Sequence, residues 1–190
     1  MDVVKAVPDL STMENAVTIN ENEKSNTEFR HKRQRKDFLS LVKNIMKDSD
    51  NQAYLTYDEG NLTTFPVTVT PNNGVYAYHS FEFRVDIPVK YPDIAPKITC
   101  VTDVYHPNID VYGDICLSLF DDWCGEVNDL RDCVMGLLFL FHHPNIDDPL
   151  TENFNDYGEL TEEEFHKRVK ESLAKKEMEG VVLDLENCHV

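Results

Sequence analysis

The chain has 190 residues, 41% of them hydrophobic, and a formal net charge of −17 at pH 7. This length favours one domain with tails, and the negative charge argues against nucleic acid or an anionic membrane as a partner. No apolar run approaches the roughly 20 residues that span a bilayer. The five cysteines and the lack of a signal-peptide pattern predict free thiols in the cytoplasm and nucleus.

Residues 1–25 show no sustained apolar periodicity, which predicts a flexible N-terminal extension. A helix is expected from about Asn26 to the polar cluster at 47–50. Its predicted apolar stripe repeats at helical spacing and consists of Phe38, Leu41, Val42 and Ile45. The basic run that includes Arg33, Arg35 and Lys36 has two interpretations, a solvated helix face or a docking surface for an acidic protein partner.

Four strands are expected next, at about 52–57, 63–70, 80–87 and 97–101. Val67 and Val69 alternate with threonines, the period-two pattern of a half-buried antiparallel sheet. A long, partly apolar loop then covers 102–128, and such loops in compact domains are often functional.

The rest of the chain is expected to be helical. The predicted elements are a helix at about 129–141, a short helix at 151–157 and a last helix that starts at Thr161 and stops at Gly180. Grouping strands and helices in this way predicts an α+β fold. We predict a core domain over 26–176 and an acidic C-terminal tail over 177–190.

Three motifs gather around the long loop: His106-Pro107-Asn108, a Cys116-Leu117 pair that follows it, and the loop 145–150 with the sequence Asn-Ile-Asp-Asp-Pro-Leu. In this combination, together with Trp123, the chain resembles the ubiquitin-conjugating enzyme family over about residues 26–176. A second His-Pro-Asn at 143–145 has no cysteine at the right distance, and we interpret it as a coincidence.

The resemblance implies the ubiquitin-conjugating fold and a catalytic role for Cys116. A cysteine thiol can hold an acyl group as a thioester, which an amine then attacks. The alternative for a single cysteine is a buried, inert side chain. The chain has no G-x-x-x-x-G-K loop and no C-x-x-C pair, so we expect neither a nucleotide cofactor nor a metal site.

The resemblance also implies roles for the residues around the thiol. Asn108 would stabilise the oxyanion or hold the active-site loop in shape, with a turn asparagine as the alternative. Asp148 would orient the attacking amine or accept its proton, the alternative being a helix-cap carboxylate. His106 and Pro107 would support the loop. Tyr105 would wall the site or simply pack in the core.

Partner-binding residues are implied at the turn that holds Asp93 and Ile94 and on the first helix, which face ligases in the family. Asp93 occupies a place where many family members have an apolar residue. Several segments resemble the neddylation branch, which conjugates the cullin modifier, and ubiquitin is the competing modifier. The implied partners are the modifier, its activating enzyme, a RING-type ligase and a protein substrate such as a cullin. A non-catalytic scaffold of the same fold and a cysteine hydrolase are the competing hypotheses for the function.

Overall fold

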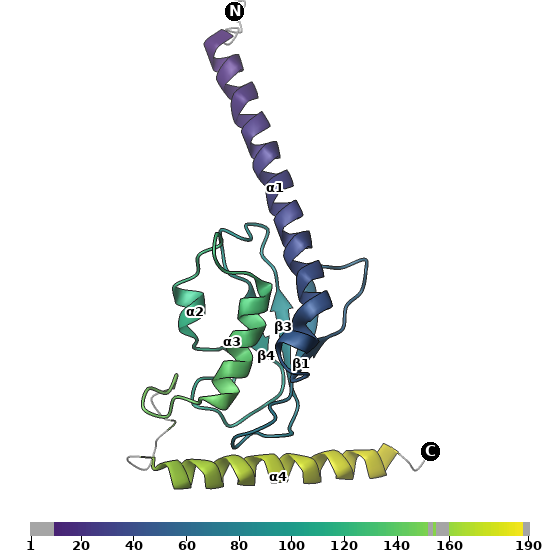
Figure 1. Ribbon diagram of the computed structural model, residues 1–190, viewed down its shortest axis with the longest axis vertical. Coiled ribbons are helices and arrows are strands. Elements are labelled where there is room, and N and C mark those ends of the chain that lie inside the picture. The colour runs from purple at the N-terminus through teal and green to yellow at the C-terminus, as the bar shows by residue number, and fades with distance from the viewer. Residues whose placement is uncertain (1–9, 152–153, 155–159, 188–190) are drawn as a thin grey trace, which may run out of the picture.

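The computed structural model describes residues 10–151, 154 and 160–187, with side chains described over 24–151, at 154 and over 160–176. Its elements, in chain order, are α1 (Leu10–Asp48), β1 (Ala53–Leu55), β2 (Thr64–Val69), β3 (Phe81–Asp86), β4 (Lys97–Cys100), α2 (Ser118–Asp121), α3 (Leu130–His142) and α4 (Glu162–Asn187). The predicted order of helix, four strands, long loop and helices is confirmed (Figure 1).

The four strands form one antiparallel sheet in the order β1-β2-β3-β4. Alternate residues face opposite sides, as the sequence pattern predicts: Phe81, Phe83 and Val85 of β3 are buried, whereas Glu82 and Arg84 are exposed. The pairing of Val67 with Leu55 and with Phe83 places the apolar residues of neighbouring strands on the same face. One face of the sheet therefore supplies the core.

Helices α1 and α3 pack against each other and cover the apolar face of the sheet (Figure 1). From α1, Phe38, Leu41 and Ile45 are buried as predicted, and Val42 is partly buried. The side chain of Asp129 accepts hydrogen bonds from the first turn of α3, and Asp132 reaches back to the Asp129 N–H. This capping box fixes the start of α3 one residue after the predicted position.

The predicted start of the first helix is wrong, since α1 begins at Leu10 and not near Asn26. Residues 10–25 are helical, and the prediction of a flexible extension therefore fails for them. A packed helix propagates at one hydrogen bond per added residue, and no Gly or Pro interrupts the chain between Pro8 and Asp48. Residues 1–9 lie outside the described residues. The N-terminal part of α1 projects away from the sheet (Figure 1).

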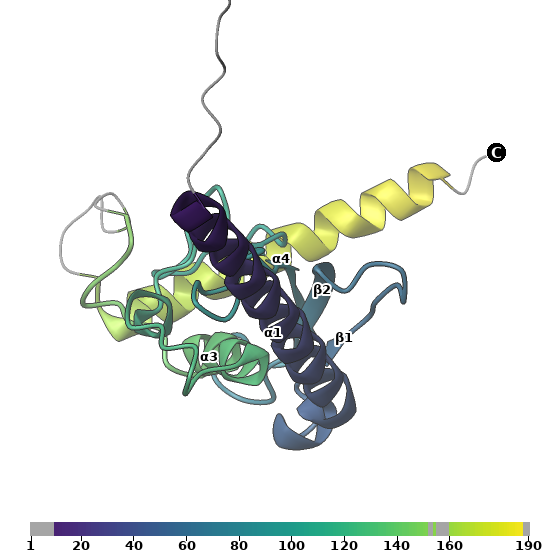
Figure 2. The same ribbon diagram turned by 90° about the horizontal axis from the view of Figure 1, so that it is seen from above.

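The predicted end of the last helix is also wrong, because α4 continues through Gly180 to Asn187. A helix glycine costs only about 1 kcal/mol relative to alanine, which is too little to stop this helix. The predicted cap is present, with the Thr161 hydroxyl accepting from the Glu164 N–H at 3.3 Å. In Figure 2 the C-terminal part of α4 extends beyond the sheet. Most of the short helix predicted at 151–157 lies outside the described residues.

Candidate active site

The predicted nucleophile lies at the end of a small hairpin. The Cys116 N–H donates to the Asn108 carbonyl at 2.9 Å, and Ile109 and Ile115 pair between the same two arms. Asp110 N–H donates to the Asp114 carbonyl at 3.0 Å and closes the tip. Cys116 is exposed, two residues before α2 begins. The hairpin thus presents the thiol to solvent from a fixed backbone.

His106 braces this hairpin from inside the protein. The Asn108 N–H donates to His106 Nδ1 at 3.0 Å, so Nδ1 is the acceptor and Nε2 carries the proton that it donates to the Leu140 carbonyl at 3.2 Å. The ring stacks against Tyr76. Burial lowers the pKa of His106 to about 3, with a small opposing effect from the bond to Leu140. A neutral histidine therefore ties the hairpin to the end of α3, which fits the supporting role implied for it.

Asn108 connects the hairpin to the loop 145–150. Its buried side-chain oxygen accepts from the Asn145 N–H at 2.9 Å, and its Nδ2 donates to the Asn145 carbonyl at 3.3 Å and the Asp148 carbonyl at 3.4 Å. Both amide hydrogens are used by these bonds. In this state Asn108 holds the loop in shape, which is one of the two roles that the resemblance implies, and the oxyanion role stays a prediction.

Asp148 is brought to the same region by that connection. The Leu150 N–H also donates to the Pro107 carbonyl at 2.8 Å, so loop 145–150 lies along the His-Pro-Asn motif. The Asp148 side chain is exposed, like that of Cys116. The structure thus groups an exposed thiol and an exposed carboxylate around one buried amide.

Tyr105 packs on the side of α4. Its ring stacks on Phe154 at 4.6 Å between centroids and lies near Phe165, and its carbonyl accepts from the Tyr76 hydroxyl at 2.8 Å. These contacts fit the core-packing alternative. A role as a wall of the thiol site stays a prediction.

The other described cysteines differ from Cys116 in their surroundings. All four described cysteines are free thiols. Burial raises the pKa of Cys100 to about 12, and burial is also the main cause of the raised pKa of Cys133. Because the thiolate is the nucleophile, these two are inert at neutral pH. Cys116 and Cys124 are exposed, and of these only Cys116 lies beside Asn108 in the hairpin.

Comparison with known protein families identifies the family of this chain. The family described as "Ubiquitin-conjugating enzyme" matches residues 30–173, well over half of the sequence. The chain belongs to the ubiquitin-conjugating enzyme family. The matched range contains the whole Cys116 hairpin and the loop that Asn108 holds.

Curated relatives of this family member carry a common name. NEDD8-conjugating enzyme UBC12 of Kluyveromyces lactis is 37% identical over 134 residues, which cover 69% of this chain and 71% of the relative. NEDD8-conjugating enzyme Ubc12 of Dictyostelium discoideum is 37% identical over 117 residues, or 61% of this chain and 50% of the relative. The chain therefore spans about half the length of the Dictyostelium relative, and 64% of Nedd8-conjugating enzyme UbcE2M of Drosophila melanogaster.

A solved structure shows the same fold. S. cerevisiae Ubc12 superposes with a TM-score of 0.65 at 29% identity, covering 84% of this chain and 89% of that chain. The predicted ubiquitin-conjugating fold is thereby confirmed.

The predicted partner-binding residue Arg33 is engaged within this family member. It donates to the buried carboxylate of Asp37 at 2.6 Å and to the Asn128 carbonyl at 3.1 Å, and Asp37 also accepts from the Tyr91 hydroxyl at 2.6 Å. The pKa of Tyr91 is raised, mainly by burial and also by this bond. Arg33 thus joins α1 directly to the loop that holds Asn128 and, through Asp37, to Tyr91. It is therefore not a free docking charge, whereas Arg35 and Lys36 are exposed.

Asp93 is paired on the surface with an arginine of α1. Arg30 donates to it through Nε at 3.1 Å and Nη2 at 2.6 Å. Ile94, beside it, is about half exposed. The Trp123 indole donates to the Pro92 carbonyl at 2.7 Å, so the loop that holds Trp123 packs on this turn. The turn is thus held rigidly, with Ile94 available for contact.

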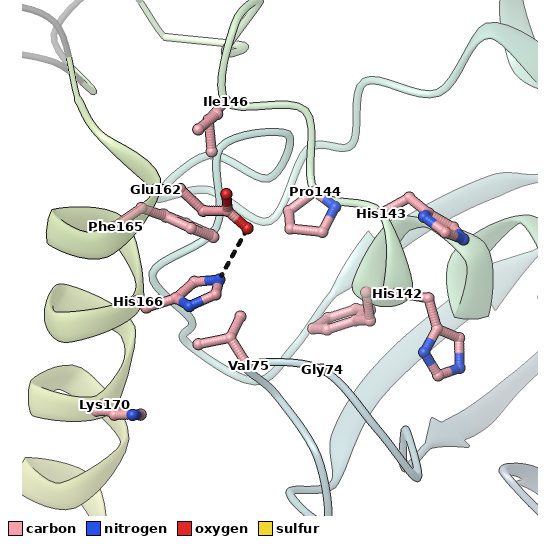
Figure 3. A pocket seen from close by; sticks show the side chains of 11 residues that line it. Gly74, Val75, His142, His143, Pro144, Ile146, Glu162, Phe165, His166 and Lys170 are labelled. Carbon is pink, nitrogen blue, oxygen red and sulfur yellow. Dashed lines mark ion pairs between the residues drawn. The ribbon is translucent and has the colours of Figure 1, made fainter.

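A pocket of about 560 Å³ lies away from the thiol, between Val75, the end of α3 and α4 (Figure 3). His166 and Glu162 approach each other there at 3.9 Å. Its lining includes Ile146 but none of the predicted site residues. Among the described residues, no group of three His, Cys, Asp or Glu side chains could hold a metal ion. None of the described helices is long and apolar enough to cross a membrane.

Sequence reasoning missed the partner of Asn108. Asn145 belongs to the second His-Pro-Asn, which we interpreted as a coincidence, yet its N–H and carbonyl both bond to the Asn108 side chain. The contact uses only backbone atoms of Asn145, so no side-chain chemistry in the sequence signals it. Asp37 was missed for a related reason, because an acidic residue on a helix is normally exposed.

Proposed function

We propose that this chain accepts a ubiquitin-like modifier from its activating enzyme as a thioester on Cys116 and transfers it to a lysine of a substrate protein. The exposed Cys116 thiol on the braced hairpin carries the proposal. The family membership and the names of the relatives support it. Its modifier is NEDD8 or a close equivalent, since the relatives at 35–37% identity are named NEDD8-conjugating enzymes.

The first step is thioester exchange. The Cys116 thiolate attacks the carbonyl of the modifier's C-terminal thioester on the activating enzyme. A new sulfur–carbon bond forms at Cys116, the carbon–sulfur bond to the activating enzyme breaks, and that enzyme's cysteine leaves as a thiolate. An exposed thiol is required because two folded proteins must approach it, and this is the condition that Cys116 meets.

The second step is attack by a lysine amine. The carbonyl becomes an oxyanion, which collapses to an amide and releases the Cys116 thiol. Stabilising that oxyanion through Asn108 requires one amide hydrogen to leave the Asn145 or Asp148 carbonyl. A carboxylate near a lysine raises its pKa, so the useful role of Asp148 is to orient the amine and to accept its proton.

The partners follow from the same proposal. They are the activating enzyme, a RING-type ligase at the turn of Asp93 and Ile94, and a substrate such as a cullin. The free state of all four described cysteines supports a reducing location, the cytoplasm and nucleus. The alternative modifier is ubiquitin, and the alternative function is a scaffold of the same fold.

A charging assay tests the modifier. The full chain is incubated with ATP and either NEDD8 with its activating enzyme or ubiquitin with its own, and thiol-sensitive adducts are measured on non-reducing gels. We expect a faster rate with NEDD8. A faster rate with ubiquitin would show that ubiquitin, and not NEDD8, is the modifier. The absence of an adduct with either pair would favour the alternative function, a non-catalytic scaffold.

Deleting residues 1–25 tests docking of the activating enzyme. This segment precedes the buried stripe of α1, so we expect the melting temperature to stay nearly unchanged. Charging by the NEDD8 activating enzyme should slow, because the proposed role of this segment is to bind the activating enzyme. The exposed Arg35 and Lys36 should add a salt-dependent share. Equal charging rates for the full and shortened chains would remove the docking role.

A further inference from the structure

The tip of the Cys116 hairpin presents two apolar side chains to solvent. Val111 is 87% exposed and Tyr112 is 82% exposed. Single exposed apolar residues are common on protein surfaces, but an adjacent pair on a rigid turn beside a nucleophile is a candidate contact surface. We call Val111 and Tyr112 the tip pair.

The tip is fixed by its own hydrogen bonds. The Asp110 carboxylate accepts from the N–H groups of Tyr112 at 2.8 Å and Asp114 at 2.9 Å. Gly113 has a φ of +81°, and its carbonyl accepts from the Cys100 N–H at 2.9 Å. A Cβ on Gly113 would lie 2.1 Å from the Cys100 carbonyl oxygen. The turn is therefore fastened to β4, and little backbone conformational entropy would be lost when a partner binds the tip pair.

The tip pair is also within reach of the reaction. Tyr112 lies four residues before Cys116, so their Cα atoms are at most about 14 Å apart. A lysine that attacks a thioester on Cys116 must bring its own chain close to this hairpin. A neighbouring residue of that chain, about four positions away, can therefore contact the tip pair.

The charged residues near the thiol indicate the chemistry of that chain, and Lys176 of α4, which lies near Cys100, is paired with Asp103 at 2.8 Å. Between Lys97 and Lys167 the sequence has a single Lys or Arg, Arg131, and it donates to Asp48 at 2.5 Å. Five acidic side chains of the hairpin, of α2 with its C-terminal cap residue and of the Asn108-held loop are exposed: Asp114, Asp121, Asp122, Asp147 and Asp148. A region with one sign of charge attracts partners of the opposite sign and speeds their association.

We propose that the tip pair recognises the acceptor segment, which is a basic peptide stretch with an apolar residue within about four positions of the modified lysine. The apolar residue packs on Val111 and Tyr112, and the basic residues face the surrounding carboxylates. This inference rests on the proposed thioester transfer and specifies its acceptor.

Single-turnover discharge tests the inference. The chain is charged on Cys116, excess activating enzyme is quenched, and the thioester is followed against the concentration of a basic peptide with one acceptor lysine and a leucine three residues away. The variant Val111→Ser/Tyr112→Ser is compared with Val89→Ser, whose side chain is also 87% exposed. A peptide with serine in place of leucine is the matched acceptor.

We expect the tip variant to need about eightfold more leucine peptide for half-maximal discharge, which corresponds to about 50 Å² of lost apolar contact. Val89→Ser should need the same concentration of leucine peptide as the wild type. With the serine peptide, the tip variant and the wild type should need equal concentrations for half-maximal discharge. Discharge to free lysine should be unchanged. The inference would be overturned if the tip variant and Val89→Ser needed the same concentration of leucine peptide. It would also be overturned if the tip variant lost as much discharge with free lysine as with the leucine peptide.

A readout that needs no thioester separates this inference from the proposed function. Nuclear magnetic resonance of the uncharged chain should show the leucine peptide shifting the amide signals of residues 110–114, more weakly in the tip variant. Slower charging of the tip variant with an unchanged peptide response would instead assign the tip to the modifier and contradict the inference. Absence of charging with the shifts present would overturn the proposed function alone.

Discussion

The candidate active site has two parts that differ in burial and in the hydrogen bonding of their side chains. The inner part, His106 and Asn108, is buried and has its hydrogen-bonding groups satisfied within the protein. The outer part, Cys116 and Asp148, is exposed to solvent. Stability and reactivity are therefore assigned to different residues. The inner part fixes the backbone, and the outer part remains accessible from solvent, as the proposed function requires.

Replacing Asn108 should give the largest combined effect. Asn108→Ala leaves the Asn145 N–H and two carbonyls without their partner, and we expect the free energy of unfolding to fall by about 1–3 kcal/mol. Transfer to lysine should slow on the order of a hundredfold, whereas charging continues. Urea denaturation and single-turnover discharge measure the two effects.

Asn145→Ala is the control for that prediction, because Asn108 contacts only backbone atoms of Asn145. It should change transfer little. If Asn108→Ala discharges to free lysine at the wild-type rate, the contribution of Asn108 is structural only.

Asp148 should show the opposite combination. Asp148→Asn keeps the shape of an exposed side chain, so the unfolding free energy should stay within about 0.5 kcal/mol of the wild type. Transfer should slow on the order of a hundredfold if the carboxylate accepts the amine's proton. Its exposed neighbour supplies the matched variant, Asp147→Asn, which should transfer normally. Equal rates for both variants would remove Asp148 from the mechanism.

The buried histidine predicts a pH dependence of stability. The pKa of His106 is about 3 in the folded protein and ordinarily 6.5, so the unfolded chain takes up a proton that the folded chain refuses as pH falls. The stability that comes from the neutral His106 is therefore present above about pH 6.5 and decreases below it. The free energy of unfolding should fall by about 2 kcal/mol between pH 7 and 5. His106→Gln should lose less stability over this range. A His106 ring that titrates near 6.5 by nuclear magnetic resonance would contradict the prediction.

The smallest effect is expected at the surface pair of Arg30 and Asp93. Their side chains are 30% and 58% exposed, and such pairs contribute less than about 1 kcal/mol. The buried bonds of Asp37 to Arg33 and Tyr91 provide the contrast, since Asp37→Asn should cost about 1–3 kcal/mol. Urea denaturation of Asp93→Asn and Asp37→Asn measures this difference. Equal losses of unfolding free energy in Asp93→Asn and Asp37→Asn would show that burial does not determine how much these interactions contribute to stability.

Much of the fold could be predicted from periodic side chains. Phe38, Leu41 and Ile45 are buried on one face of α1, and the alternating residues of β2 and β3 face opposite sides of the sheet. Helix ends were predicted poorly, because no apolar period marks residues 10–25 and the penalty of Gly180 is small compared with helix propagation.

The site was predicted from its motifs but not from its connections. The grouping of Cys116, Asn108 and Asp148 agrees with the expectation, since the hairpin and loop 145–150 are joined. The Asn108–Asn145 bonds and the Arg33–Asp37–Tyr91 connection depend on burial between segments that are distant in the sequence. The spacing of residues along the sequence does not predict such contacts.

The location of the thioester tests the role of Cys116 most directly. Wild type, Cys124→Ala, Cys116→Ala and Cys116→Ser are each incubated with ATP, NEDD8 and its activating enzyme, and the products are separated with and without a thiol reductant. We expect a reductant-sensitive adduct on the wild type and Cys124→Ala, none on Cys116→Ala, and, where Cys116→Ser is charged, a reductant-resistant ester. A reductant-sensitive adduct on Cys116→Ala would contradict that role.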